Sequence, residues 1–174
     1  MPYILKVVIA GEGGVGKTAL TVRFCKGVFL EGTKMTIGVD FSAVKVTLGQ
    51  DEVTLQLWDF GGESRFRFIL PGYCRGAAGA LLVFDTTQKY TFESLPEWLT
   101  LLRDNTKSDK GNVPIVLVGT KMDLDGRQIQ KEEAEEWAKA NNLTGYVECS
   151  SKTGEQVGYV FGMVTQSMLA TRKG

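Results

Sequence analysis

The residues of this sequence best suited to chemistry are four glycines followed by a lysine and a threonine. They lie in the segment GEGGVGKT at 11–18, which matches the pattern GxxxxGK[ST]. Glycines allow positive φ, so successive backbone N–H groups can turn inward and surround an anion. Lys17 can reach the outer phosphates of a nucleotide, and the Thr18 hydroxyl can ligate a magnesium ion bound to them. The segment therefore predicts a phosphate-binding loop.

The same glycines fit a second pattern, GxGxxG, at Gly11, Gly13 and Gly16. That pattern is typical of dinucleotide sites, which also need an acidic residue about twenty positions further on to hold a ribose. Glu31 and Asp40 are the nearest acidic candidates, and neither fits that role well. Because a lysine directed at a pyrophosphate is foreign to that design, the phosphate-loop interpretation is favoured. A dinucleotide site and a chance glycine-rich turn are the alternatives.

A second polar segment follows the alternating run 53–58. The Asp59 carboxylate can hold magnesium through a water molecule, and Gly62 can give a backbone N–H to a terminal phosphate. Residues 59–61 also read DFG, a metal-binding motif of protein kinases. The chain lacks the HRD loop of those enzymes and is too short for their fold, so this match is set aside.

A third polar segment, TKMD, contains Thr120, Lys121 and Asp123 and follows the apolar run that ends at Val118. The Asp123 carboxylate can accept hydrogen bonds from guanine N1–H and the exocyclic amine, which adenine does not offer. A buried carboxylate facing adenine is penalised, so selectivity for guanine can be large. TKMD alone is a weak signal, but behind a phosphate loop and Asp59 it indicates a guanine-nucleotide site.

Strand-like and helix-like segments alternate along the whole chain. Predicted strands lie at 4–10, 39–48, 53–58, 79–84, 113–118 and 146–149; predicted helices lie at 17–26, 91–106, 131–141 and at the apolar stripe Val157, Val160, Phe161, Val164 and Met168. The segments 27–38 and 59–72 show no clear period and are predicted to be loops. This order predicts a mostly parallel sheet with helices on both faces and ligands at the carboxyl ends of the strands.

Length and composition indicate one soluble globular domain over residues 1–174, with 43% hydrophobic and 23% charged residues. Twenty basic residues balance twenty acidic ones, so neither nucleic acid nor an anionic membrane is expected as the main partner. The chain has no histidine, which excludes Ser/His/Asp and Cys/His catalysis.

Cys25, Cys74 and Cys149 are predicted to be reduced, buried thiols of a cytoplasmic protein. No leader peptide, membrane span or terminal prenylation cysteine is recognised, so membrane attachment would need a lipidated tail outside this sequence.

Together these residues resemble the Ras-superfamily small GTPases, and among them the Rab group. The resemblance covers nearly the whole chain and rests on the segments GEGGVGKT at 11–18, TIGVDF at 36–41, WDFGGESRF at 58–66, YCRGA at 73–77, GTKMDL at 119–124 and ECSSKTGE at 148–155. It implies an α/β fold, the P-loop NTPase three-layer α/β/α sandwich. That fold would have a six-stranded, mostly parallel sheet with one antiparallel edge strand and about five helices.

The resemblance also implies a set of site residues. Nucleotide contacts would come from Gly13, Gly14, Val15, Gly16, Lys17, Thr18, Ala19, Phe29, Thr36, Gly62, Thr120, Lys121, Asp123, Ser150, Ser151 and Lys152. Thr18 and Thr36 would ligate magnesium directly, and Asp59 through water. The catalytic residues would be Lys17, Gly62 and Glu63. Segments 27–38 and 59–72 would be switch I and switch II.

Glu63 departs from the family pattern, because it stands where small GTPases have a glutamine that orients the attacking water. An amide accepts from water and donates to phosphate, whereas a carboxylate only accepts and is repelled by the γ-phosphate. Slow hydrolysis is therefore expected, although a carboxylate is also a stronger base. Phe60-Gly61 replaces a pair of small residues and is expected to change how switch II hinges. Thr120 replaces a common asparagine, a variant also found in the Rho group.

The expected function is that of a magnesium-dependent switch that binds GTP and GDP, hydrolyses GTP and signals through the two switch loops, in membrane trafficking by the Rab resemblance. Phe41, Trp58 and Tyr73 match the aromatic trio that Rab proteins present to effectors; exchange factors and GTPase-activating proteins would be further partners. A monomer is expected, cytoplasmic or peripheral at a membrane surface. A nucleotide-bound interaction module with negligible hydrolysis and an ATP-using P-loop enzyme remain alternatives.

Overall fold

A six-stranded sheet forms the centre of the computed structural model, which describes residues 2–29, 31 and 38–174, apart from the side chains of residues 64 and 66. Its strands are β1 (Pro2–Ala10), β2 (Val39–Leu48), β3 (Asp51–Phe60), β4 (Gly79–Asp85), β5 (Ile115–Thr120) and β6 (Gly145–Glu148), in the order β2-β3-β1-β4-β5-β6. β2 runs antiparallel to β3, and every other pairing is parallel. The predicted sheet is confirmed.

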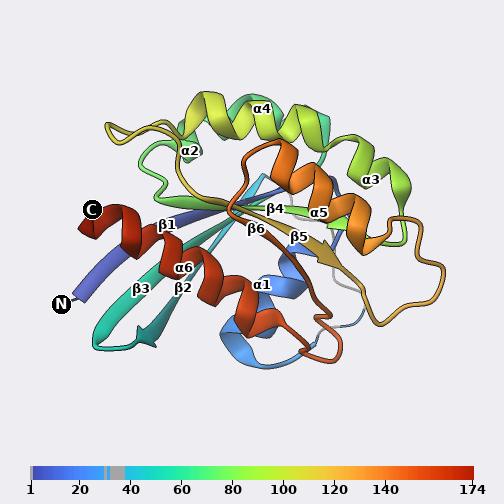
Figure 1. Ribbon diagram of the computed structural model, residues 1–174, viewed down its shortest axis with the longest axis horizontal. Helices are drawn as coiled ribbons and strands as arrows, with labels where there is room; N and C mark the ends of the chain where they lie inside the picture. Colours follow the sequence, from blue (N-terminus) through green and yellow to red (C-terminus); the bar gives the residue numbers. More distant parts are fainter. Residues whose placement is uncertain (1, 30, 32–37) are drawn as a thin grey trace.

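Helices cover both faces of this sheet, which gives three layers (Figure 1). The helices are α1 (Lys17–Lys26), α2 (Leu70–Cys74), α3 (Lys89–Glu93), α4 (Leu95–Asn105), α5 (Lys131–Ala140) and α6 (Val157–Lys173), with a 3-10 helix, η1 (Ser64–Ile69), leading into α2. α1 and α6 pack on one face, and α2 to α5 lie on the other. Since α3 runs into α4, the described part of the chain has five helical segments besides η1. No described helix is both long and apolar enough to span a bilayer.

Several element boundaries differ from the sequence predictions. The predicted loop 59–72 contains the last residues of β3, all of η1 and the start of α2. β3 extends to Phe60 because that side chain is fully buried in the core. β5 begins at Ile115, after Pro114, since proline has no N–H to give to a strand ladder. The predicted helix 91–106 is divided at Ser94, with Pro96 accommodated in the first turn of α4.

Alternate residues of the central strands enter two separate cores. On β1, Leu5, Val7 and Ile9 pack towards α1 and α6, whereas Val8 and Ala10 pack towards α2 and α4. All are at most 1% exposed. With both faces of these strands filled by apolar side chains, polar side chains that act on a ligand are confined to strand ends and to the loops beyond them.

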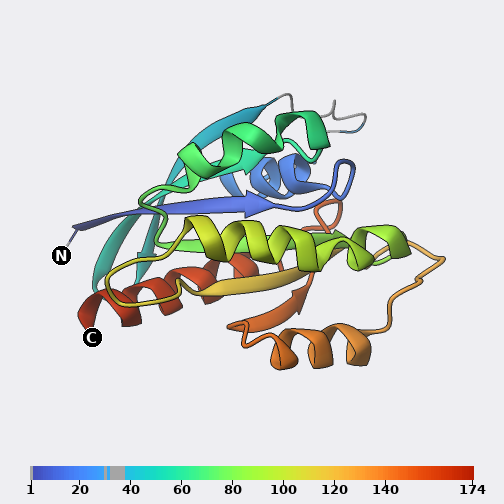
Figure 2. The ribbon, with the colours of Figure 1, turned by 90° about the horizontal axis from the view of Figure 1, so that it is seen from above.

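The carboxyl ends of the parallel strands meet at one edge of the sheet, as the shared direction of β1, β3, β4, β5 and β6 requires. The polar or glycine residues at or just after these ends are Gly11, Asp59, Asp85, Thr120 and Glu148. Both chain termini lie at the opposite end of the molecule (Figure 2). The predicted site segments therefore share one edge, as expected for this class of fold.

Candidate functional site

The loop that follows β1 requires glycine at particular positions. A Cβ on Gly11 would lie 2.2 Å from the carbonyl oxygen of Val83, so no other residue fits there without movement. Gly14 and Gly16 have φ of 78° and 98°, and Gly16 caps the N-terminus of α1. Left-handed backbone of this kind strains any residue with a Cβ. The loop can thus present backbone N–H groups next to a helix N-terminus, which favours an anion.

Lys17 is held inside this loop. Its side chain is 5% exposed, and Nζ donates hydrogen bonds to the carbonyl oxygens of Gly11, at 2.9 Å, and Glu12, at 2.8 Å. Burial lowers the pKa of Lys17 to about 8, although the nearby charges of Asp59 and Glu12 act in the other direction. A buried ammonium group is stabilised by an adjacent anion, so this environment suits the phosphates of a nucleotide.

Thr18 and Asp59 form the candidate metal site. The Thr18 hydroxyl donates to Oδ2 of Asp59 over 2.5 Å, and Asp59 is 2% exposed at the end of β3. A hydroxyl and a carboxylate are the oxygen donors that Mg²⁺ prefers, and the family's magnesium would fit here. In the described part of the chain no three acidic or cysteine side chains gather to hold a metal, so phosphate oxygens and water would complete the coordination. Thr36 lies outside the described residues.

Gly62 lies directly against the phosphate-binding loop. A Cβ at this position would be 2.0 Å from the backbone nitrogen of Gly13 and 2.6 Å from its Cα. The preceding residue, Gly61, donates its N–H to the carbonyl oxygen of Gly38 over 2.6 Å. The start of segment 59–72 is therefore in backbone contact with the loop that would hold the phosphates.

Thr120 and Lys121 link the third polar segment to the same loop. The Thr120 hydroxyl donates to the carbonyl oxygen of Val15 over 2.5 Å, and Nζ of Lys121 donates to the carbonyl oxygen of Gly14 over 2.9 Å. Lys121 also pairs with the buried carboxylate of Asp85 at 2.8 Å. The Thr120 side chain thus bridges this segment to the phosphate-binding loop.

Asp123 is oriented by the segment that follows β6. The Ser150 hydroxyl donates to Oδ1 of Asp123 over 2.8 Å, and the N–H of Met122 donates to the carbonyl oxygen of Cys149 over 3.2 Å. The carboxylate is exposed while its neighbours are fixed, which suits recognition of a base edge. Ser151 is buried beside it and Lys152 is exposed.

Beneath this segment, Glu148 joins two elements. Both of its oxygens accept from Arg127, at 2.7 and 2.9 Å, and the Tyr146 hydroxyl donates to Oε2 over 2.7 Å. Burial alone would raise the pKa of Glu148, but hydrogen bonds from Arg127 and Tyr146 outweigh it and hold that pKa below its usual value. The ion pair between Arg127 and Glu148 thus fixes the end of β6, two residues before Ser150.

Arg127→Ala is expected to lower the free energy of unfolding at pH 7 by about 2–3 kcal/mol, because it leaves a buried carboxylate without its cation. Because the pKa of Glu148 is lower in the folded state than in the unfolded state, its ionised form stabilises the fold at pH values above the unfolded pKa. This stabilisation is lost as the pH falls through the folded pKa. The difference from wild type should therefore shrink by pH 4. Urea unfolding in a fixed excess of GDP measures both values, with the exposed Arg75→Ala as control. An equal effect of the two substitutions would contradict the prediction.

Glu63 borders a pocket of about 450 Å³ between the phosphate-binding loop and η1. Its lining residues are Glu12, Gly13, Gly62, Glu63, Arg65, Arg67 and Tyr90. The Glu63 carboxylate accepts a hydrogen bond from Nε of Arg65 over 2.5 Å, and both side chains are partly exposed. Glu63 therefore stands beside Gly62 in a pocket next to the phosphate-binding loop, with the guanidinium of Arg65 offsetting its charge.

Comparison with known proteins shows the family to which the chain belongs. The sequence model of the Ras family matches residues 6–170. The Ras-related protein Rab-11C of Dictyostelium discoideum is 38% identical over 160 residues, which cover 91% of this chain and 70% of the relative. The chain belongs to the Ras family. It is accordingly a GTPase, and proteins of this family bind GTP and GDP and generally use Mg²⁺.

The dinucleotide alternative fails on this Ras-family topology. Such a site needs an acidic residue at the end of the second parallel strand. Here β2 runs antiparallel at the edge of the sheet, and Asp40 is exposed near its beginning. The parallel strand β3, beside β1, has Asp59 as its penultimate residue, and that carboxylate accepts a hydrogen bond from Thr18.

For some of the predicted site residues of this Ras-family protein, the structure shows no side-chain contact with the phosphate-binding loop. Val15 is fully buried, so only its backbone can face a ligand. Ala19 lies in the first turn of α1, and Phe29 is half-buried in the loop after that helix. Contact of Phe29 with a base stays a prediction.

Sequence reasoning missed several residues that shape the site. Glu12 occupies a position of the GxxxxGK[ST] motif at which any residue is allowed, so the motif gave it no role. Its contacts are with Arg67, 55 positions later, and Trp98, 86 positions later. Asp85 is the last residue of the apolar strand β4, and its place at the carboxyl end of that strand was the one sequence signal for a role in the site. No local pattern pairs Arg127 with Glu148.

The aromatic trio forms a continuous row on the Ras-family fold. The ring centroids of Phe41 and Trp58 are 4.9 Å apart, and those of Trp58 and Tyr73 are 5.5 Å apart. Phe41 is 48% exposed, so its side chain is not part of the buried core. Phe68, on η1, is 80% exposed and was not singled out from the sequence.

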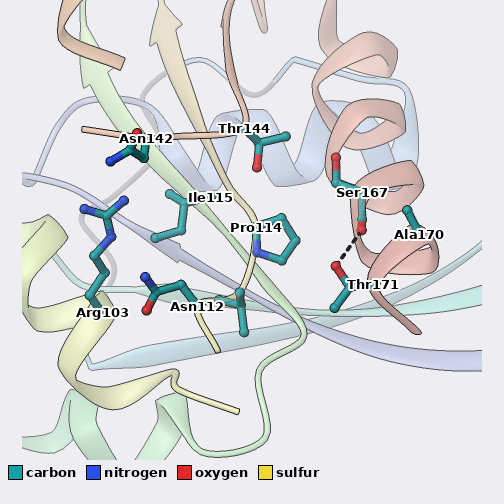
Figure 3. Close-up of a pocket in the computed structure, with 10 residues that line it drawn as sticks. Arg103, Asn112, Pro114, Ile115, Asn142, Thr144, Ser167, Ala170 and Thr171 are labelled. Carbon is teal, nitrogen blue, oxygen red and sulfur yellow. Dashed lines mark hydrogen bonds between the residues drawn. The ribbon is translucent and has the colours of Figure 1, made fainter. Parts of the chain in front are cut away.

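A pocket of about 490 Å³ lies away from this site, between the end of α4, the start of β5 and α6 (Figure 3). In the close-up, Arg103 and Asn142 lie on one side, and Ser167 and Thr171 on the other. Its lining includes Ile115, the first residue of β5, so it opens at the amino ends of the strands. Ligands of this fold class bind at the opposite edge, and this pocket is not part of the nucleotide site.

Proposed function

We propose that this chain binds GTP and GDP with magnesium at the carboxyl edge of its sheet, hydrolyses GTP slowly, and signals the bound nucleotide through segments 27–38 and 59–72. The observation that carries the proposal is the bonding between the polar segments. The bonds are Thr18 to Asp59, Thr120 to Val15, Lys121 to Gly14 and Ser150 to Asp123. They support the proposal because they join the residues proposed to bind the phosphates, the metal and the base.

In this proposal the chain acts mainly by positioning and by stabilising charge. Water attacks the terminal phosphoryl group of GTP, and GDP and phosphate leave. Lys17 and the N–H of Gly62 stabilise the negative charge on the phosphoryl oxygens, while Glu63 accepts a hydrogen bond from the water. Magnesium, bound by Thr18 with Asp59 beside it, would neutralise phosphate charge. Loss of the terminal phosphate would free Gly62 and, with it, segment 59–72.

The bound nucleotide itself gives the simplest test. Protein purified in the presence of magnesium should carry GDP or GTP, identified by extraction and chromatography. The proposed Asp123 contact to the guanine edge supports this expectation, because adenine lacks the two matching donors. Recovery of ATP or of a dinucleotide would overturn the assignment of the base.

Glu63→Gln is expected to raise the single-turnover rate of GTP hydrolysis about tenfold or more. The amide can orient water and donate to the phosphate, whereas the carboxylate repels it even with Arg65 beside it. Glu136→Gln makes the same change on the exposed face of α5 and should leave the rate unchanged. A slower Glu63→Gln variant would instead make Glu63 a productive base. A wild-type rate equal to that of buffer would favour the nucleotide-bound interaction module.

Partners are proposed from the same surface. The row Phe41, Trp58 and Tyr73 borders the segment whose position would depend on the nucleotide, and the exposed Phe41 and Tyr73 can contact an effector. Exchange factors and activating proteins would act on the adjoining loops. The similarity to a Rab protein supports a role in membrane trafficking, with the chain as a monomer in the cytoplasm or peripheral at a membrane.

A further inference from the structure

Glu12, in the phosphate-binding loop, has a side chain that turns away from the predicted phosphate position and towards two other elements. Its Oε1 accepts from Nη2 of Arg67, on η1, over 2.8 Å. The same oxygen accepts from the indole Nε1 of Trp98, on α4, over 3.0 Å. One carboxylate oxygen thus joins the loop to both elements.

Arg67 is the centre of this arrangement. Its guanidinium carbon lies 4.4 Å from the centroid of the Trp98 ring, and Nη1 pairs with Oε2 of Glu97 at 3.0 Å. The Glu12 and Arg67 side chains are 20% and 26% exposed, whereas Glu97 is 73% exposed. Since shielding from water strengthens an ion pair, the pair with Glu12 should hold Arg67 more strongly than the pair with Glu97.

The segment held in this way includes the proposed catalytic groups. Arg67 follows Gly62 by five positions, and Gly62 lies against the backbone of Gly13. Glu12, Glu63 and Arg67 line the same pocket. A shift of Arg67 away from Glu12 would therefore displace the segment whose placement beside the phosphate the reaction needs.

We propose that Glu12 is a positioning residue, whose carboxylate holds segment 62–69 against the phosphate-binding loop through Arg67 and Trp98. Glu12 thereby fixes the places of Gly62 and Glu63 for hydrolysis. This last step rests on the proposed function, whereas the holding of the segment does not. In this role the Glu12 carboxylate acts through its hydrogen bonds with Arg67 and Trp98.

Two substitutions separate this role from a direct electrostatic effect. Glu12→Gln keeps an oxygen that can accept from Trp98 but removes the charge that binds Arg67. Because the Glu12 charge also acts on Lys17, this variant alone does not isolate the ion pair. Arg67→Ala breaks the pair from the other side and leaves the charge of Glu12 in place. Glu97→Gln is the matched control, since it removes the exposed carboxylate from the same guanidinium.

The experiment measures amide hydrogen exchange of 62–69, single-turnover GTP hydrolysis and GDP affinity in the whole 174-residue chain. Glu12→Gln and Arg67→Ala should each increase exchange of 62–69 at least about fivefold and slow hydrolysis about tenfold. GDP affinity should change by less than about threefold, because GDP lacks the phosphate next to Gly62. The double variant should be no slower than the slower single variant. Glu97→Gln should match wild type in all three measurements.

Unchanged exchange in both variants would overturn the proposal, and so would additive losses of rate in the double variant. Increased exchange with wild-type hydrolysis would also overturn it, because the held segment would then not position the reaction. If wild-type protein bound or hydrolysed no GTP, the proposed function would fail. The exchange measurements would still decide whether Glu12 holds the segment.

Discussion

Asp123→Asn is expected to weaken the binding of GDP and GTP at least about 10³-fold. Guanine presents N1–H and an amine, and the carboxylate can accept from both, whereas an amide places a donor against one of them. The Ser150 hydroxyl holds Asp123 at 2.8 Å, so the side chain cannot easily turn to adapt. Competition between fluorescent GDP and unlabelled nucleotides measures the loss.

The same variant should prefer a base with the complementary pattern. Xanthine carries a carbonyl where guanine carries its amine, and the side-chain amide that the substitution introduces can donate to that carbonyl. Xanthosine diphosphate should therefore bind the variant more tightly than GDP does, the reverse of wild type. Asp125→Asn, two residues further along, serves as a control for the loss of charge in this segment. Equal loss of GDP and xanthosine diphosphate would show that Asp123 does not read the base.

Gly62→Ala is expected to reduce GTP hydrolysis by about 10²-fold. The new methyl group would lie 2.0 Å from the nitrogen of Gly13, far inside van der Waals contact, and backbone on either side cannot yield cheaply. Segment 59–72 would move away from the phosphate-binding loop and take Glu63 with it, and small misplacements of this kind have large effects on rate. Single-turnover hydrolysis with excess enzyme gives the change directly.

Gly72→Ala is the matched control for this substitution. It introduces the same methyl group ten residues later, in α2, where nothing lies within 4 Å of the added carbon. Alanine should stabilise that helix slightly and leave hydrolysis unchanged. GDP affinity should remain within a few-fold of wild type in both variants. A Gly62→Ala protein with wild-type turnover would show that contact between these backbones is unnecessary for the reaction.

The parts of the fold that were predicted correctly are those with short-range signals. Around Lys17, an apolar run marks the strand, the glycine spacing marks the loop, and a helical period marks the helix. All three elements are present in the structure. Asp59 and Thr120 were expected just after strands, where the chain changes from apolar to polar; Thr120 is the last residue of β5, and Asp59 is the penultimate residue of β3. The site edge then follows from strand direction alone.

What the sequence did not reveal depends on partners distant along the chain. η1 and α2 lack an apolar period of their own, and they are set by packing such as the fully buried Phe60 and Leu70. Arg67 has no neighbours in sequence that indicate its contact with Glu12, 55 positions earlier. Such pairings are decided only after the sheet has brought the loops together, so spacing rules cannot predict them.

The placement of the chain ends has a practical result. β1 starts at Pro2 and carries the chain about 30 Å to the glycine loop, while α6 returns it to the starting side, where Lys110 caps the last carbonyl groups. A fluorescent protein or surface-coupling tag joined to either terminus would thus emerge far from the nucleotide. Sensors assembled this way should report on regulators without obstructing their access.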